Sequence, residues 1–395
     1  MAERVWVVLP VAQRADGSWI DDTLAARTAE AGLGARAPEA GRFPRQRVEL
    51  FRGPGAAEEV ERRFRRRGWT DGLPIVVPTT GRVAELVRGS GRVPHDVLGK
   101  MGPLGGLATV ERAAANAVMA GCGVEQFPFV VAAVEAVCDL AFNLAGVQTT
   151  DENVAPLVVI SAPAAWRERA ELNSGFGVLG PGWRGNATIG RAVRLVLHNL
   201  GGAWPGAVSF AGAGQPGRYG LVAAEDDETC PWPPLRVEHG HGAGDAVVVV
   251  GRAESAVNVT GGVNELVSVM GSATSAFTAL QGGSAAVLLA PHTAGELARS
   301  GRSRAGVAEL LAERAVIPHA VWRTLWLAQL AQQGSGGASG EGGLHAERDL
   351  AVIVDPSQLL VFVAGGTIPI PQHVWFPGWG FPPAQIVRPV TPPVR

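Results

Sequence analysis

Two stretches of the chain follow the same order: an apolar run, an Ala-Pro pair, an amphipathic segment and a Ser-Gly pair. The first reads LVVISAPAAWRERAELNSG from Leu157, and the second reads AAVLLAPHTAGELARSG from Ala285. A short apolar run that passes through a cap into a helical pattern is typical of a β-strand followed by its crossover helix. The sequence therefore predicts an α/β fold, with mixed or parallel sheets and flanking helices.

A second helical pattern follows each of these units, so internal duplication into two similar halves is one hypothesis. The alternative is that two independent units look alike because capping rules are general. We expect a first α/β domain with a glycine-rich loop at residues 68–230 and a second α/β domain at residues 231–395. Residues 1–67 are expected to form a strand with an irregular and helical extension.

Composition and charge narrow the class of protein. The chain has 395 residues, of which 47% are hydrophobic and 18% charged, so it can bury a large core and exceeds the usual size of one domain. Its net charge of -2 gives no overall attraction to nucleic acid or to an acidic membrane. The excess of Ala, Gly and Arg is typical of a bacterial genome rich in G and C.

Localisation is predicted from the apolar segments and the cysteines. The longest apolar segment, residues 127–147, contains Glu135 and Asp139, so we expect a buried helix and no membrane span. The three cysteines form neither a disulfide framework nor a metal-ligand spacing, which fits a reducing compartment. We therefore expect a soluble, cytoplasmic protein.

The stretch NSGFGVLGPGWRGNATIGR, residues 173–191, packs glycines between two polar anchors and leads into a helical pattern. We expect that helix to start at Asn186 or Thr188, which would leave its first N–H groups free to bind an anion. An ordinary capped, glycine-rich turn is the alternative.

Neutral polar residues are dense in this stretch and in the segment FNLAGVQTTDEN. Such side chains need hydrogen-bond partners in apolar surroundings, so they either form turns or line a site. The candidates for substrate binding are Asn143, Gln148, Thr150, Asn173, Ser174, Asn186 and Thr188.

Cys122 lies at the joint between two helical patterns, where a helix dipole would favour its thiolate. We interpret it as the candidate nucleophile or redox thiol, with a small buried side chain as the alternative. His292 and Glu111 are the candidates for acid/base catalysis. His239 and His241 have the H-x-H spacing of metal ligands, but a third ligand is not evident and surface histidines are favoured.

Residues 332–343 are expected to form a flexible loop because they are almost entirely Gly, Ser, Ala and Gln. The C-terminal tail from residue 367 is rich in proline, so we expect it to pack irregularly and to form no central strand. Its aromatic residues are expected to be buried, in the chain itself or at a subunit interface, namely Trp375, Phe376, Trp379 and Phe381.

Several segments resemble a family of uncharacterised bacterial proteins associated with neighbours of the small selenocysteine- or cysteine-containing UGSC proteins. They are WTDGLPIVVPTTGRV, ATVERAAANAVMAGC, FNLAGVQTT, NSGFGVLGPGWRGNATIGRAVRLVL and APHTAGELARSGRSRAGVAELLAERA. The resemblance implies no established activity. From Ala364 the chain departs from it, with AGGTIPIPQHVWFP where the family pattern has a Gly-Gly-Ala-Gly-(Arg/Lys)-His-Ser-like segment.

Three functional hypotheses remain open. The first is an enzyme of specialised or sulfur- and selenium-related metabolism, a cysteine-dependent transferase, lyase or oxidoreductase with a small polar or anionic substrate. The second is a non-catalytic subunit that docks a partner through the aromatic tail, the partner being a small (seleno)protein or a second copy of the chain. A metal-dependent hydrolase using His239, His241 and Asp245 is third. The sequence identifies no cofactor.

Overall fold

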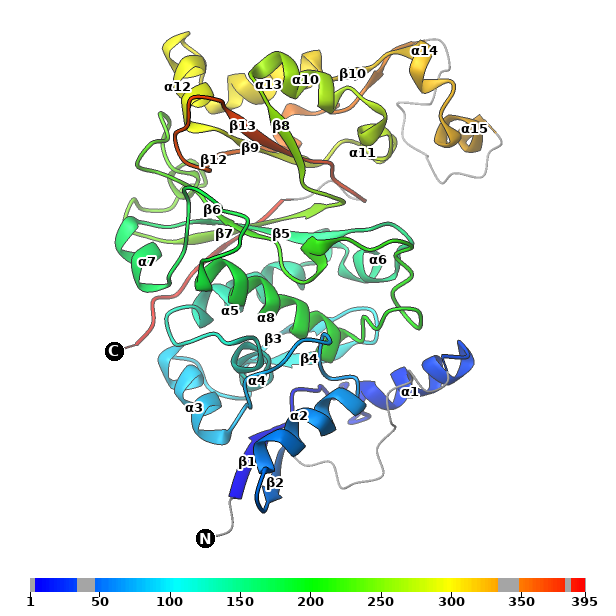
Figure 1. Ribbon diagram of the computed structural model, residues 1–395, viewed down its shortest axis with the longest axis vertical. Coiled ribbons are helices and arrows are strands. Elements are labelled where there is room, and N and C mark those ends of the chain that lie inside the picture. Colours follow the sequence, from blue (N-terminus) through cyan, green and yellow to red (C-terminus); the bar gives the residue numbers. More distant parts are fainter. Residues whose placement is uncertain (1–3, 34–46, 333–347, 381–384, 395) are drawn as a thin grey trace.

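The computed structural model describes residues 4–33, 47–332, 348–380 and 385–394. Two four-stranded sheets lie face to face in the middle of the molecule, and helices cover the outer face of each sheet (Figure 1). Both sheets contain parallel and antiparallel neighbours. The prediction of an α/β fold with mixed sheets is confirmed.

The lower sheet in Figure 1 has the strand order β14-β7-β5-β6. Its strands are β5 (Ala155–Ser161), β6 (Val222–Ala224), β7 (Val247–Ala253) and β14 (Ile386–Pro389). The crossover from β5 to its parallel neighbour β6 contains α7 (Ala164–Arg169) and α8 (Arg184–Gly201). Helices α8 and α5 (Phe127–Val137) cover the outer face of this sheet.

The upper sheet has the order β12-β9-β13-β8. Its strands are β8 (Val257–Thr260), β9 (Ala285–Leu289), β12 (Leu359–Val363) and β13 (Gln372–Phe376). The helices above it are α10 (Val263–Met270), α12 (Pro291–Arg299) and α13 (Arg304–Arg314). One interior strand of each sheet, β5 in the lower and β9 in the upper, has a parallel neighbour on one side and an antiparallel neighbour on the other. Internal duplication is not shown by this likeness and stays a prediction.

Burial on both faces explains why the central strands are continuously apolar. Leu157 and Val159 of β5 pack between the sheets, in one cluster with Leu288 of β9 and Phe362 of β12. The alternate residues, such as Val158, face the helices on the other side. Because successive side chains of a strand point to opposite faces, a strand covered on both sides is apolar at most of its positions.

The other elements extend the two ends of the molecule. The remaining helices are α1 (Ile20–Glu30), α2 (Ala56–Arg66), α3 (Thr80–Gly89), α4 (Val110–Ala120), α6 (Leu144–Thr149), α9 (Leu235–Glu238), α11 (Ala276–Leu280), α14 (His319–Trp322) and α15 (Trp326–Gln332). The remaining strands pair as β1 (Arg4–Val8) with β2 (Val48–Arg52), β3 (Val97–Met101) with β4 (Gly106–Thr109), and β10 (Val316–Ile317) with β11 (Leu350–Ala351).

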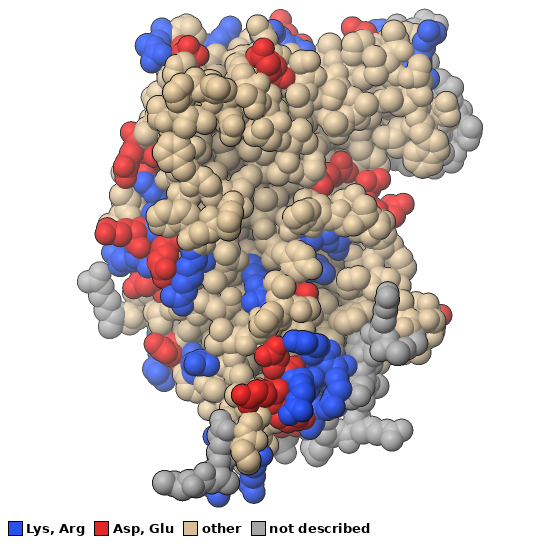
Figure 2. Space-filling view, in the orientation of Figure 1, with Lys and Arg blue, Asp and Glu red and all other residues tan. Residues whose placement is uncertain are grey.

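Helix α2 carries opposite charges in pairs. Glu59 lies within 4 Å of Arg62, Arg63 and Arg66, and Glu61 accepts a hydrogen bond from Arg65 at 2.7 Å. Figure 2 shows both signs of charge gathered over this helix at the lower end of the molecule. Opposite charges three or four residues apart on a helix stabilise it through such pairs.

Thr79 and Thr109 cap α3 and α4, each accepting a hydrogen bond from the third residue on. Residues 73–77 are apolar but form no strand, and Val76 donates to the carbonyl of Met119 instead. Helix α8 begins at Arg184, not at Asn186 or Thr188.

The C-terminal tail contradicts the expectation that it cannot enter a sheet. Strand β13 is an interior strand, paired with β8 and β9, and β14 joins the other sheet beside β7. The run QHVWF contains no proline, because the prolines of the tail lie on either side of it. Every residue of the run can therefore donate a backbone hydrogen bond within a sheet. Trp375 and Phe376 are completely buried and Trp379 is 9% exposed, so the expected burial is confirmed for them. Phe381 lies outside the described residues.

The expected boundary at residue 230 passes through one sheet, since β5 and β6 precede it while β7 and β14 follow it. Most of the expected loop at residues 332–343 lies outside the described residues. In the part of the chain that the structure describes, no single helix is long and apolar enough to cross a membrane. One bent pair, residues 127–137 with 140–149, reaches that length and composition, and α5 within it is almost wholly buried in the core.

Candidate anion-binding site

Helix α8 holds the WTDG segment, residues 69–72, against its surface. His198 Nε2 lies 2.7 Å from the carbonyl oxygen of Gly68, and Asn199 Nδ2 donates to the carbonyl of Trp69 at 2.9 Å. Arg191 donates two hydrogen bonds to the carboxylate of Asp71, at 2.8 and 2.9 Å. Since a carbonyl only accepts, His198 Nε2 carries a proton and Nδ1 holds the lone pair.

A contact between two glycines places a second loop beside the same helix. A Cβ on Gly190 would lie 2.9 Å from Gly220 Cα, so only a residue without a side chain permits this approach. The loop that ends at Gly220 carries Arg218, whose Nη2 donates to Ser209 Oγ at 2.5 Å. Arg218 is thereby brought beside Arg194 of α8.

These segments enclose a cavity of about 930 Å³, which we call the arginine pocket. Two residues of α8, Arg194 and His198, contribute to its walls. The other wall residues are Leu33, residues 70–72, residues 204–206, residues 213–216, Arg218 and Tyr219. A volume of this order is typical of sites for organic small molecules and is far larger than an inorganic ion requires.

The arginine pocket has an excess of positive charge. Burial and the positive charge of Arg218 lower the pKa of Arg194 to about 10, and burial lowers that of Arg218. Neither arginine forms an ion pair with a carboxylate among the described residues. Burial would raise the pKa of Asp71, but its hydrogen bonds and ion pair with Arg191 lower it, so this carboxylate is charged and already engaged. Two guanidinium groups without an ion pair among the described residues, and one carboxylate that is already paired with Arg191, therefore line the pocket.

The arginines retain unused hydrogen-bonding capacity. In the described part of the chain, Arg194 donates one hydrogen bond, from Nη2 to the carbonyl of Ala203 at 3.1 Å. The Nη1 atom of Arg218 is buried and has no partner there. Two close guanidinium groups with free donors and no counter-ion are the arrangement that binds carboxylate or phosphate.

His198 carries a neutral, buried imidazole in the wall of the arginine pocket. Burial, and after it the charge of Arg194, lowers the pKa of His198 to about 4, so the imidazole is neutral near pH 7. Its Nδ1 has no hydrogen-bond partner among the described residues. A neutral imidazole with a fixed tautomer can accept a proton or a hydrogen bond in this wall.

Trp204 is held rigidly at the edge of His198. The two rings meet edge to face, with centroids 5.1 Å apart and an interplanar angle of 64°. The carbonyl of Trp204 accepts hydrogen bonds from the N–H groups of Ala207, Val208 and Ser209. The loop that carries the ring is thus closed on itself, and the ring contributes a fixed apolar wall.

The glycine-rich loop does not form the anion site expected of it. The side chain of Asn186 accepts from Asn173 N at 2.8 Å and donates to the carbonyls of Asn173 and Val178 at 3.0 Å. Gly185 N donates to Glu171 O at 3.0 Å, so the chain covers the start of α8. These amides close the loop on itself, and the predicted free N–H groups are engaged.

Cys122 lies beside the first turns of α8 and is 7% exposed. Its thiol is hydrogen-bonded to Thr188, and Arg184 and Arg191 are near, yet burial outweighs them and raises the pKa to about 12. This direction is opposite to the one expected from a helix dipole. The structure thus brings Cys122 and Thr188 together, in surroundings that disfavour the thiolate.

The candidate acid/base residues lie elsewhere. Glu111 is in the first turn of α4 and forms an ion pair with Arg47, whereas Cys122 follows the other end of that helix. His292 is in the first turn of α12, in the opposite helix layer, beside Glu296 at 3.6 Å. The structure does not bring either residue to Cys122.

The remaining substrate-binding candidates have local roles. Asn143 caps α6, accepting from Gly146 N, and Thr150 accepts from Glu152 N at 3.1 Å. Gln148 is buried and donates to the carbonyl of Gly102, while its Oε1 has no partner among the described residues. The backbone carbonyl of Ser174 accepts from Gly365 N at 2.8 Å. None of the four lines the arginine pocket.

Among the described residues, the structure places no further metal ligands beside His239 and His241. His239 follows the short helix α9, and Asp245 accepts a hydrogen bond from Gly242 N at 2.8 Å. Across the described residues, no group of three or more His, Cys, Asp or Glu side chains is placed to hold a metal ion. The proposed metal site at His239, His241 and Asp245 therefore has no support in the geometry.

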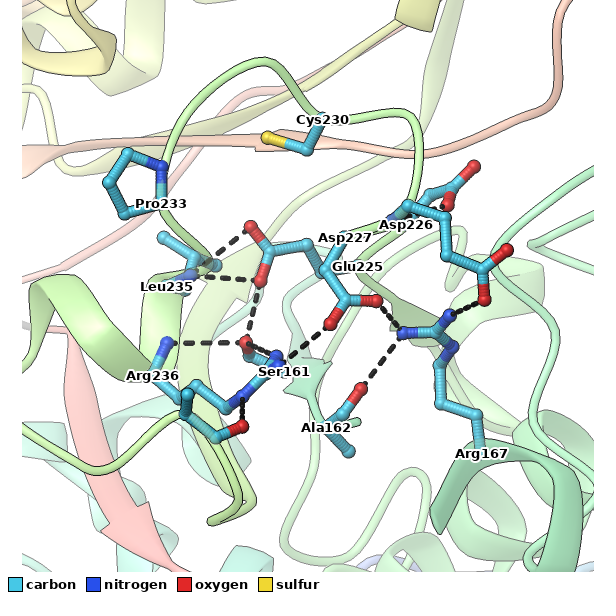
Figure 3. A network of polar contacts seen from close by, with 12 residues as sticks. Ser161, Ala162, Arg167, Glu225, Asp226, Asp227, Cys230, Pro233, Leu235 and Arg236 are labelled. Atoms are coloured by element: carbon cyan, nitrogen blue, oxygen red, sulfur yellow. Dashed lines mark hydrogen bonds and ion pairs between the residues drawn. The ribbon is translucent and has the colours of Figure 1, made fainter. Parts of the chain in front are cut away.

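A second polar cluster lies between the sheets (Figure 3). The carboxylate of Glu225 accepts hydrogen bonds from Ser161 Oγ at 2.6 Å and Leu235 N at 2.9 Å. It also accepts one from Arg304 Nη2 at 2.9 Å. Asp227 bridges Arg167 and Arg236 in the same network. A cavity of about 280 Å³ adjoins Arg304. Because the charges here compensate one another, this cluster is a structural link rather than the stronger candidate site.

Sequence reasoning missed the residues of the arginine pocket, although a signal was present. Arg191, Arg194 and His198 recur at helical spacing in IGRAVRLVLHNL, a segment that is otherwise apolar. Charged residues on one face of a buried helix need partners or a site. Comparison of the chain with models of known protein families, with curated proteins and with solved structures finds no match in any of the three.

Proposed function

We propose that this protein binds a small organic anion in the arginine pocket, as the substrate of an enzyme of small-molecule metabolism. The observation that carries the proposal is the pair Arg194 and Arg218, which line one cavity and form no ion pair with a carboxylate among the described residues. Keeping two like charges together in a partly buried wall is unfavourable, so an anion that neutralises them would bind strongly.

His198 supports a catalytic role within this proposal. It is neutral, its tautomer is fixed by Gly68, and its Nδ1 is unengaged in the described part of the chain. A bound anion would offset the charge of Arg194, which now lowers the pKa of the imidazole. Substrate binding would therefore raise the basicity of His198 and favour proton abstraction from the substrate.

Two earlier hypotheses receive less support. Burial and the raised pKa of Cys122 disfavour nucleophilic catalysis by its thiolate. Docking through the aromatic tail requires exposed rings, whereas Trp375 and Phe376 are buried inside their own sheet. The arginine pocket is therefore the better basis for a functional proposal.

Binding of inorganic phosphate and sulfate, measured by isothermal titration calorimetry, tests the proposal. Arg194→Gln and Arg218→Gln are each expected to weaken binding by about tenfold or more, because a charge-assisted hydrogen bond is lost. Arg62→Gln on α2 makes the same change of charge outside the pocket and is expected to leave binding unchanged. Equal affinities in all three variants would contradict the proposal.

The stability of the same variants separates loss of binding from loss of fold. Without ligand, Arg218→Gln is expected to unfold at the same or a higher temperature than the wild type, because repulsion between two guanidinium groups is relieved. A lower melting temperature together with weaker binding would indicate damage to the fold.

A further inference from the structure

The wall of the arginine pocket contains both charged and aromatic side chains. Arg194 and Asp71 are contributed by α8 and the WTDG segment. The loops beside them contribute Trp204, Pro205 and Tyr219, and Leu33 also lines the cavity. An oxyanion bound to the arginines would use only a small part of a cavity of about 930 Å³.

We propose that the ligand of the arginine pocket is an aromatic oxyanion, a planar ring that carries a phosphate or carboxylate group. The ring lies against Trp204 and Tyr219, while its anionic group reaches Arg194 and Arg218. This inference rests on the proposed function and adds the class of ligand to it.

The aromatic wall is built to receive a ring. Tyr219, the single tyrosine of the chain, is 54% exposed although it follows Arg218 directly. Its ring therefore presents apolar surface at the mouth of the cavity. Trp204 is held by the closed turn and by the edge-to-face contact with His198. The indole ring of Trp204, fixed in this way, offers a flat surface at little further cost in conformational entropy.

Hydrogen bonds connect the side chain of Arg218 with the loop that carries Trp204. Arg218 donates to Ser209, which in turn donates through its backbone N–H to the carbonyl of Trp204. The guanidinium group of Arg218 and the loop that carries the indole ring thus belong to one hydrogen-bonded unit. A ligand that joins an anion to a ring matches both parts of that unit.

Matched ligands test the inference by calorimetry: inorganic phosphate against phenyl phosphate, and acetate against phenylacetate. The wild type is expected to bind the ring-bearing member of at least one pair about tenfold more tightly or better, because the ring removes apolar surface from water. The pair that shows the effect identifies the anionic group as phosphate or carboxylate.

Variants show whether the preference arises in the arginine pocket. Trp204→Leu and Tyr219→Ala are each expected to reduce the ratio between the affinities of the two members of a pair by about threefold or more. Trp326→Ala removes a tryptophan that is 68% exposed and outside the pocket, and is expected to keep the ratio. Tyr219→Ala changes an exposed side chain, so its result does not depend on recovery of folding after a core substitution.

The outcomes distinguish the two proposals. If phosphate binds through Arg194 and Arg218 but phenyl phosphate and phenylacetate show no advantage, the aromatic ligand is excluded and the anion site stands. An advantage that survives in Trp204→Leu and Tyr219→Ala also excludes it. If none of the four compounds binds, both proposals are overturned.

Discussion

His198 shows how one helix residue can serve structure and chemistry at once. The imidazole donates from Nε2 to Gly68, which fixes the segment before the WTDG loop, and this leaves Nδ1 as an acceptor. The free acceptor is a consequence of the structural hydrogen bond, because only one nitrogen of a neutral ring carries a proton. The residue is 4% exposed, so its protonation is coupled to folding.

The pH dependence of stability should report this coupling. The pKa of His198 is about 4 in the folded chain, below its ordinary value of 6.5, so the unfolded chain binds the proton first as pH falls. The free energy of unfolding is therefore expected to rise between about pH 4 and pH 6.5, with a contribution from this group of about 3 kcal/mol.

Urea unfolding across this range, followed by circular dichroism, measures the effect. His198→Gln keeps a donor near the position of Nε2 and removes the titratable group, so the difference between its profile and that of the wild type isolates His198. Parallel profiles for the two proteins would show that the imidazole does not titrate in this way.

The structure predicts a slowly reacting thiol at Cys122, whereas the place of this residue in the sequence suggests a reactive one. Because burial raises its pKa to about 12, the reactive thiolate is scarce near pH 8. Alkylation by iodoacetamide in the native protein is expected to be more than about a hundredfold slower than in urea, as read at each cysteine by mass spectrometry. Rapid native labelling of Cys122 alone, absent in Cys122→Ser, would restore the nucleophile hypothesis.

At the scale of elements, the arginine pocket depends on how closely the loop before β6 approaches α8. A Cβ at position 190 would lie 2.9 Å from Cα of Gly220, in the loop, and 3.1 Å from Cγ2 of Val222, the first residue of β6. Gly190→Ala must therefore push the loop outward and carry Arg218 away from Arg194. We expect a loss of about 1–3 kcal/mol in stability and weaker binding of phosphate.

Gly81→Ala is the matched control. Gly81 is also a helical glycine, in α3, and a Cβ there would meet nothing within 4 Å. Alanine is the better helix former, so this change is expected to stabilise the protein by up to about 1 kcal/mol and to leave phosphate binding intact. Tight binding of phosphate by Gly190→Ala would show that the glycine contact does not position the site.

The elements were more predictable from the sequence than the site. Thr79, Thr109 and Gly121 act through local hydrogen bonds and backbone conformation, so short motifs reveal them. Strand β13 was missed because its place is decided by partners distant in the sequence, β8 and β9. The arginine pocket joins Asp71, α8 and the loop around Arg218, and no local pattern records that these segments meet.

At the scale of the whole molecule, two features connect the upper and lower halves. The C-terminal segment supplies β13 to one sheet and β14 to the other. Arg304 of α13, in the upper helix layer, donates to the carbonyl of Val361 and reaches Glu225, which follows β6 of the lower sheet. Since both links cross the packed faces of the sheets, we expect the halves to unfold in one transition rather than separately.

Arg304→Gln tests the second of these links. Glu225 is completely buried, and without Arg304 its carboxylate would keep neutral donors from Ser161 and Leu235 but lose its cation. Removing one member of a buried ion pair typically costs about 3–5 kcal/mol, so urea unfolding should show a loss of that order.

The double variant Arg304→Gln with Glu225→Gln distinguishes a lost ion pair from lost packing. A neutral amide at position 225 needs no cation, so the double variant is expected to be more stable than Arg304→Gln alone, and a double-mutant cycle should give a coupling of about 1–3 kcal/mol. Additive effects would mean that Arg304 acts only through its hydrogen bond to the carbonyl of Val361 and its packing on Trp232. In that case the apolar cluster between the sheets and the tail strands β13 and β14 would connect the halves without a contribution from this ion pair.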